Sequence, residues 1–213
     1  MEDGLKVSPE QWREQSLKIA RTLGYPPATA LPIVDEFGGP RPPSQVLDRL
    51  LALEGVVAAS CGLDRQKVRA WLEKEKIWSA LTDEERAFIA QAKGDPETLV
   101  ARVEAMWALA WTLGIVSELD FSTYCSKQFA SMMPDIEKGE SSDRFRAGVH
   151  PRSFDEVAAA CDLSYCLHWA IRQALRTGTN IPGKVHGYVV LQRRRALEWV
   201  LSDYSWDDVP MDT

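Results

Sequence analysis

The sequence predicts an all-α protein, a single-domain compact bundle of about seven or eight helices with a long proline-rich loop. Three observations lead to this prediction. Helix-start signals recur along the chain, apolar residues follow them at helical spacing, and no alternating strand pattern or Asn-Gly hairpin interrupts the series. A chain of 213 residues with 45% apolar composition can bury one sizeable core, so residues 1–213 are expected to form one domain.

The N-terminal part predicts a helix followed by a loop. A helix is expected over residues 9–23, because Ser8 can cap it, Pro9 suits the first helical position and Glu10 lies in the first turn. Residues 24–43 contain six prolines, which exclude a regular helix, so a long loop is predicted there. Long loops in compact domains are often functional.

Further start signals follow in the next part of the chain. A second helix is expected over about residues 44–61, Asp64 caps a third, and Thr82 with Glu85 forms a capping box for a fourth. Asp95 opens a fifth helix, which is apolar almost all round over residues 99–113. That helix is expected to be the central one of the bundle, ended by Gly114.

The C-terminal part predicts three more helices. One is expected over residues 122–133, one over about 154–176 behind a second capping box, and one over about 185–203. Residues 134–151, which are rich in glycine, serine and charge, have the composition of a linker.

Residues 204–213 form an acidic tail after the last predicted helix. Trp199 and Trp206 are expected to hold this tail against that helix. Residues 193–195 are all arginine, and the tail's aspartates follow closely enough to neutralise them. A phosphate site at the three arginines is the alternative.

Charge and composition exclude several classes of protein. With 31 acidic against 25 basic residues the net charge is −6, which argues against binding to nucleic acid or to an anionic membrane and favours a partner of basic character. The N-terminus lacks a secretory signal and no segment is long and apolar enough to span a membrane, so a cytoplasmic location is expected. The four cysteines lack a C-x-x-C spacing and are expected to be reduced and buried. Nucleotide, zinc and hydrolase signatures are absent, so no cofactor and no metal is expected.

Four polar side chains lie in helices that otherwise look buried, and each needs a partner there. They are Glu104, Asp162, His168 and Arg195. Asp162 and His168 are six residues apart, about 120° out of register on a helix, so they cannot form an acid–base dyad alone. An enzyme would need Glu104 as the acid that joins His168, with Arg195 holding an anionic group. A structural polar network is the other interpretation, and its members are Asp162, Tyr165, His168, Arg195, Trp199 and Asp207.

Several short motifs resemble a known family. In the C-terminal third they are Asp162-x-x-Tyr165-x-x-His168-Trp169, Arg194-Arg195-Ala196-Leu197-x-Trp199 and Trp206-Asp207-Asp208-x-x-x-Asp212-Thr213. Upstream they are Arg21-x-Leu23-Gly24-Tyr25-Pro26, Leu31-Pro32 and Glu104-Ala105-x-Trp107-Ala108-Leu109-x-Trp111-x-Leu113-Gly114. Together they resemble the bacterial family known as domain of unknown function 4272. The resemblance implies a single-domain, helical, intracellular protein and carries over no catalytic residue.

Two hypotheses for function follow from the sequence. The first is a non-catalytic cytoplasmic protein-binding module, for which an immunity protein that neutralises a cognate toxin is the most concrete version. The acidic charge, the long loop and the tail favour it. The second is an enzyme of unknown reaction that uses Glu104, His168 and Arg195. The sequence predicts neither the residues that bind a partner nor the oligomeric state.

Overall fold

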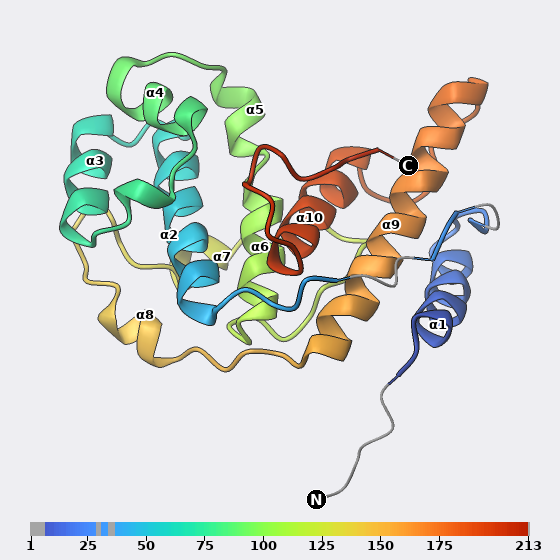
Figure 1. Ribbon diagram of the computed structural model, residues 1–213. Coiled ribbons are helices and arrows are strands. Elements are labelled where there is room, and N and C mark those ends of the chain that lie inside the picture. Colours follow the sequence, from blue (N-terminus) through green and yellow to red (C-terminus); the bar gives the residue numbers. More distant parts are fainter. Residues whose placement is uncertain (1–6, 29–30, 34–36, 213) are drawn as a thin grey trace, which may run out of the picture. The chain divides into compact units, whose positions relative to one another are not determined.

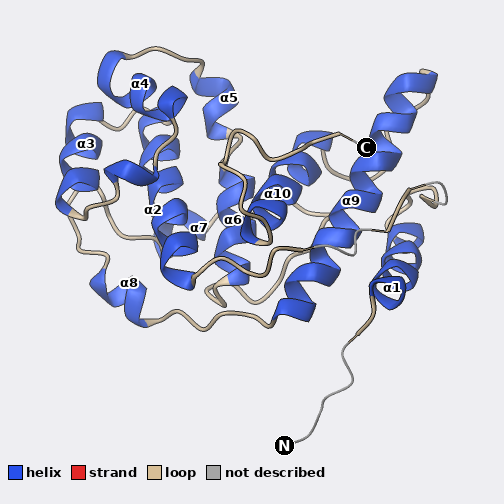
Figure 2. Cartoon of the chain, in the orientation of Figure 1, coloured by secondary structure: helices blue, strands red, loops and turns tan. Residues whose placement is uncertain are grey.

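The computed structural model describes residues 7–28, 31–33 and 37–212. Throughout these residues the secondary structure is helical and no strand occurs, as Figure 2 shows. The all-α prediction is therefore confirmed. The chain forms two compact units. Unit 1 comprises Met1–Pro40, Asp120–Tyr124 and Arg152–Thr213, and unit 2 comprises Arg41–Leu119 and Cys125–Pro151.

Unit 1 is built around one long helix. This helix, α9 (Phe154–Thr177), contacts both α1 (Pro9–Thr22) and α10 (Gly187–Val200), and Figure 1 shows α1 beside it. The predicted capping box is confirmed at the start of α9, because the Ser153 side chain accepts from the Glu156 amide and the Glu156 carboxylate accepts from the Ser153 amide. Ser8 caps α1 in the same way, with Gln11 as its partner.

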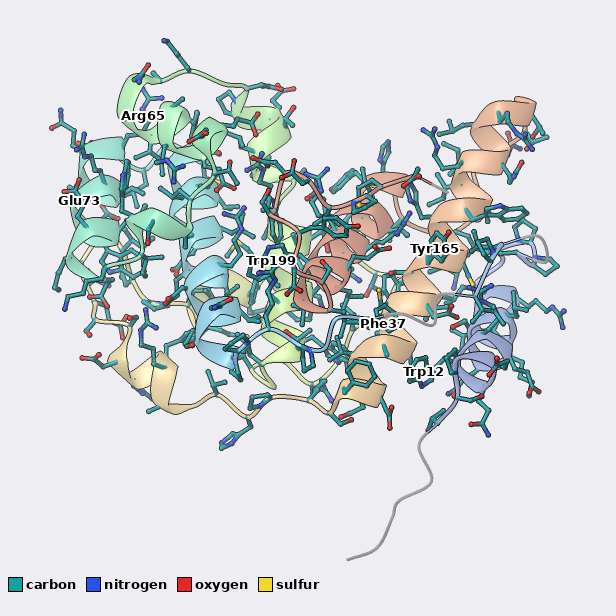
Figure 3. The ribbon with its side chains drawn as sticks, viewed as in Figure 1. Trp12, Phe37, Arg65, Glu73, Tyr165 and Trp199 are labelled. Carbon is teal, nitrogen blue, oxygen red and sulfur yellow. The ribbon has the colours of Figure 1, made fainter. Side chains whose placement is uncertain are left out.

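The proline-rich loop is fastened to α1 and α9 by apolar side chains. Phe37 packs against Trp12 of α1 and Phe154 of α9, with ring centroids 6.2 and 6.1 Å away (Figure 3). Leu31 is buried in a small cluster that also contains Cys166. In the described parts of residues 24–42 no helix forms, as the prolines predict, while residues 29–30 and 34–36 of this loop lie outside the described residues.

Unit 2 is centred on α2 (Pro43–Ser60). This helix contacts the helices around it, and most of its residues from Val46 to Val56 are buried. The other elements of this unit are α3 (Arg65–Lys74), η1 (Trp78–Ala80), α4 (Asp83–Gln91), α5 (Pro96–Val100), α6 (Val103–Thr112), α7 (Phe129–Met132) and α8 (Asp143–Ala147). The predicted caps Asp64, Thr82 and Asp95 all accept from backbone amides at the starts of α3, α4 and α5.

The single helix predicted through residues 99–113 is wrong, because α5 and α6 are separated by a turn at Ala101 and Arg102. Backbone hydrogen bonds there join residues three positions apart, in place of the four-residue spacing of an α-helix. The Arg102 amide donates to the Leu99 carbonyl, and the Glu104 amide donates to the Ala101 carbonyl. The Arg102 side chain ends in ion pairs with Glu84 and Glu85 of α4. These pairs orient the turn, and α2 rather than the predicted helix is central in this unit.

The helix predicted over residues 122–133 is also wrong, since only α7 forms there. The Asp120 carboxylate accepts from the Ser122 amide, and the Glu104 carboxylate accepts from the Cys125 amide at 3.0 Å. Arg193 binds the carbonyls of Asp120 and Thr123. Side chains thus bond the backbone groups that a helix would have paired internally.

Residues 134–151, whose composition resembles a linker, are folded against α3. The Trp71 indole donates to the Glu140 carbonyl at 2.7 Å, and Glu75 accepts from the Ser142 amide at 3.0 Å. The segment then meets the end of α6, where Gly114 terminates the helix as predicted. Gly114 has φ +72°, and a Cβ there would overlap the His150 carbonyl oxygen, so only glycine fits.

None of the four cysteines forms a disulfide, as predicted, but not all are buried. Cys161 and Cys166 are buried, Cys125 is half-buried and Cys61 is exposed at the end of α2, where its side chain leaves the core of unit 2. No helix in the described part of the chain has both the length and the apolarity needed to cross a membrane.

Candidate functional site

Asp162, one of the candidate site residues, pairs with an arginine of α1. Arg13 and Asp162 are 7% and 4% exposed, and the Arg13 Nη2 lies 2.7 Å from the Asp162 Oδ1. The same guanidinium donates to the carbonyls of Leu31 and Pro32, at 2.8 and 3.0 Å. The pair therefore joins α1, α9 and the proline-rich loop within unit 1, and its contacts are those of a structural clamp.

His168 is held by Arg194 of α10. The Arg194 Nη1 donates to the His168 Nδ1 at 2.5 Å, and the ring is 5% exposed. Burial, together with the positive charges of Arg194 and Arg172, lowers the pKa of His168 to about 4. The imidazole is neutral near pH 7 and its Nδ1 is occupied by the arginine, so this nitrogen does not act as a general base there.

Arg194 joins α9, α10 and the C-terminal segment. Its Nε binds the Glu198 carboxylate at 2.7 Å, its guanidinium lies 4.5 Å from the ring centroid of Tyr165, and its Nη2 donates to the Asp212 carbonyl at 3.1 Å. Arg195, the member of the run that the enzyme hypothesis uses, is half-buried on α10. The arginine that meets His168 is thus its neighbour.

Glu104 lies in unit 2, whereas His168 and Arg195 lie in unit 1. Glu104 is 1% exposed and accepts from the Cys125 amide. Neither unit by itself therefore contains the predicted acid–base pair. Two arginines of this unit pair with other carboxylates, Arg49 with Glu85 at 2.6 Å and Arg69 with Glu73.

Glu85, which the sequence marks only as a helix cap, is the centre of an ion-pair cluster. It is fully buried between Arg49 and Arg102. Burial raises the pKa of Glu85, but the two guanidinium groups lower it more, so the net pKa lies below the usual value. The cluster ties α2, α4 and the turn before α6 together, which gives Glu85 a structural role.

The C-terminal segment folds back on α10, as predicted. Trp206 packs edge-on against Trp199 with ring centroids 5.6 Å apart, and Figure 3 labels Trp199. Trp206 and Val209 are buried, and the Pro210 and Asp212 carbonyls accept from Arg194. Residue 213, the end of the predicted tail, lies outside the described residues.

The predicted neutralisation of the arginines by the tail's carboxylates is wrong. Arg193 binds the carbonyls of Asp120 and Thr123. Arg194 binds Glu198 and the carbonyls of Pro210 and Asp212, so the tail reaches Arg194 with its backbone and not with its carboxylates. The aspartates of the tail, and Asp203 just before it, are all exposed, and none of them forms an ion pair among the residues that the structure describes: Asp203, Asp207, Asp208 and Asp212. We define residues 203–212 as the acidic segment.

Comparison with known protein families gives one match. The family described as Domain of unknown function (DUF4272) matches residues 13–209, nearly the whole length. The chain belongs to this family. Searches of the curated proteins and of the solved structures found no match.

In this DUF4272 chain, several residues of the quoted motifs are the ones that hold unit 1 together. Asp162 binds Arg13, Tyr165 lies under the Arg194 guanidinium, and His168 accepts from Arg194. Sequence reasoning found these residues but missed Arg13. Its only signal is its place with Ser16 and Ala20 on one buried face of α1.

Proposed function

We propose that this DUF4272 protein is a non-catalytic, cytoplasmic binding protein that docks a basic protein partner through the acidic segment. One observation carries the proposal: four exposed aspartates, which form no ion pair with any other residue that the structure describes, lie on a segment that is fixed to α10. A fixed acidic surface attracts a basic one and loses little conformational entropy when the partner binds. The net charge of −6 acts in the same direction.

The contacts of the buried titratable side chains support binding rather than catalysis. Asp162 is bound by Arg13, His168 by Arg194, and Glu104 by the Cys125 amide. Groups held in this way stabilise a fold, whereas a catalytic acid or base must reach a substrate. The most concrete version of the proposal is an immunity protein whose acidic segment covers a basic surface of its toxin.

The proposal is tested by purifying the tagged protein from its own organism at low salt. The test variant replaces Asp203, Asp207, Asp208 and Asp212 by Asn, and the control variant replaces four exposed acids elsewhere by Gln: Glu14, Glu73, Glu97 and Glu118. Both variants change the net charge by the same amount. We expect one stoichiometric basic partner with the wild type and the control variant, and loss of that partner with the test variant.

Mass spectrometry of the intact complex gives the stoichiometry. A lone monomer from the wild type, or equal recovery of the partner with both variants, would contradict docking through the acidic segment. Addition of salt should release the partner, because salt weakens the attraction between exposed charges; the screening length is about 10 Å at 0.1 M and becomes shorter as salt is added.

A further inference from the structure

Glu54 lies in the middle of the apolar helix α2 and has no partner for one of its oxygens. The residue is 7% exposed, and its Oε2 is buried without a hydrogen bond. Glu54 forms no ion pair with any residue of the described part of the chain. Burying a carboxyl group in this way is unfavourable unless a donor or a cation reaches it.

Glu54 lines a cavity of about 570 Å³ that lies wholly within unit 2. The wall is mostly apolar and comes from α2, α6 and α7 with the segment that follows, including Val57, Met106, Phe129, Met133 and Ile136. Cys61 and Glu137, which also line the cavity, are exposed, so it opens to solvent on their side. This volume accommodates a small organic molecule.

The polar groups of the cavity are mainly carboxylates. Besides Glu54 they are Asp135, Glu137 and Glu140. Two exposed lysines form ion pairs with two of these carboxylates. The Lys138 Nζ lies 2.7 Å from the Asp135 Oδ2, and the Lys67 Nζ lies 3.8 Å from the Glu137 Oε1. Neither lysine pairs with Glu54. Burial, reinforced by the negative charges of Glu140 and Asp135, raises the pKa of Glu54 well above its usual value.

We propose that this cavity binds a small organic cation, an ammonium group on an apolar body, with the ammonium at Glu54 and the hydrocarbon part against Val57, Met106 and Phe129. An anion would be repelled by the carboxylates, and a neutral apolar molecule would leave Glu54 without a donor. Among residues 7–28, 31–33 and 37–212, no group of three His, Cys, Asp or Glu side chains could hold a metal ion, so a bare metal ion fits less well. This site goes beyond the proposed function and lies in unit 2, whereas the acidic segment lies in unit 1.

Binding is coupled to release of a proton. The cation stabilises the ionised form of Glu54, so the carboxyl proton passes to the buffer as the ammonium–carboxylate pair forms. No other bond changes. Affinity for the cation should therefore rise with pH until Glu54 is ionised in the free protein.

The test uses three six-carbon probes of similar size: hexylammonium, hexanol and hexanoate. Binding to the full-length protein is followed by amide chemical shifts in NMR titrations. We expect hexylammonium to bind most tightly, with shifts at the residues that line the cavity. In the Glu54→Gln variant its affinity should fall about tenfold, the effect of losing one charge-assisted bond, while hexanol binds as before. Glu97→Gln, at an exposed position, should leave all three affinities unchanged.

Three results would overturn the proposal. They are hexylammonium binding no tighter than hexanol, hexylammonium binding undiminished in Glu54→Gln, and shifts that lie away from the cavity. Glu54→Gln is close in shape to the wild type and removes only the charge. Its circular dichroism and unfolding curve are measured beside those of the wild type, so that a loss of affinity can be told from a loss of structure. A missing protein partner would contradict only the proposed function and leave this site standing.

Discussion

At the scale of single residues, the strongest constraint in unit 1 is the buried pair of Arg13 and Asp162. Breaking such a pair from one side leaves an uncompensated buried charge, which costs about 3–5 kcal/mol. We therefore expect Arg13→Met to lower the free energy of unfolding by that amount, as measured by urea denaturation. The double variant Arg13→Met/Asp162→Leu should recover much of the loss, because it buries no charge.

The control for this experiment is Lys18→Met. It breaks the exposed pair of Lys18 with Glu14 on the same helix, and both side chains are 69% exposed. Exposed pairs contribute little, so its unfolding curve should match that of the wild type. If Arg13→Met behaves like Lys18→Met, the pair does not hold α1 to α9.

His168 predicts a loss of stability in mild acid. Its pKa is about 4 in the folded protein and about 6.5 in an unfolded chain, so between these values the unfolded chain binds more protons. The stabilising contribution is fully present above about pH 6.5 and is lost as the pH falls through 4, by roughly 3 kcal/mol in total.

The measurement is a series of urea curves between pH 7.5 and pH 4. The variant His168→Gln can still accept a bond from Arg194 but does not titrate, so its stability should depend less on pH over this range than that of the wild type. His150→Gln, at an exposed position, serves as the control. A wild-type curve parallel to that of His168→Gln would show that His168 is not kept neutral.

The sequence marked Asp162, His168 and Glu104 because each is polar within an apolar stretch. It did not identify their partners. Helical periodicity places a side chain on a face of its own helix, but it does not say which other helix covers that face. Arg13 and Asp162 are 149 positions apart in the chain, and consecutive arginines at 193–195 point about 100° apart, so no local pattern selects Arg194 for His168.

Glu54 could have been found by the rule that found Glu104, since it interrupts the apolar run of α2.

At the scale of elements, local chemistry predicted where helices begin. The caps at Asp64, Thr82, Asp95 and Ser153 are bonds between residues two or three positions apart, so the sequence contains both partners. The helix predicted over residues 122–133 failed for the opposite reason. The carboxylate of Glu104 and the guanidinium of Arg193, which bond its backbone, come from distant parts of the chain.

The end of α6 provides a prediction at this scale. At Gly114 a Cβ would overlap the His150 carbonyl, and the residue has positive φ, whereas at Gly62 φ is also positive but no atom lies within 4 Å of the added Cβ. Gly62→Ala should therefore cost only the strain of the backbone, about 1 kcal/mol. Gly114→Ala adds the overlap and should cost more than about 3 kcal/mol.

Urea unfolding of the two variants measures this difference directly. Both positions carry backbone strain, with φ +99° at Gly62 and +72° at Gly114, so an excess loss at Gly114 reports the contact between the end of α6 and residues 148–151. Equal losses at the two glycines would mean that this segment moves away at little cost. In that case residues 134–151 would behave as the linker that their composition suggests.

At the scale of the whole molecule, the thiols at the two extremes of exposure distinguish native protein from unfolded protein. Thiol reagents react with the thiolate, so a reactive cysteine must be exposed and must have a pKa that is not far above the pH of the experiment. Burial raises the pKa of Cys166 to about 12 and that of Cys161 well above its usual value, and both lie on α9 inside unit 1. Cys61 is exposed in unit 2.

We expect a disulfide reagent at pH 8 to label Cys61 rapidly in the native protein and to label Cys161 and Cys166 only as fast as unit 1 opens. Cys61→Ser should remove the rapid phase, and mass spectrometry of peptides identifies the residue modified at each time. Urea should accelerate the slow phase, while Arg13→Met should accelerate it without urea, since losing the Arg13–Asp162 pair makes opening of unit 1 easier. Labelling of Cys166 at the rate of Cys61 would mean that α9 is not covered by α1 and the proline-rich loop. The same variant therefore tests, through stability and through thiol exchange, whether one ion pair between distant segments closes this unit.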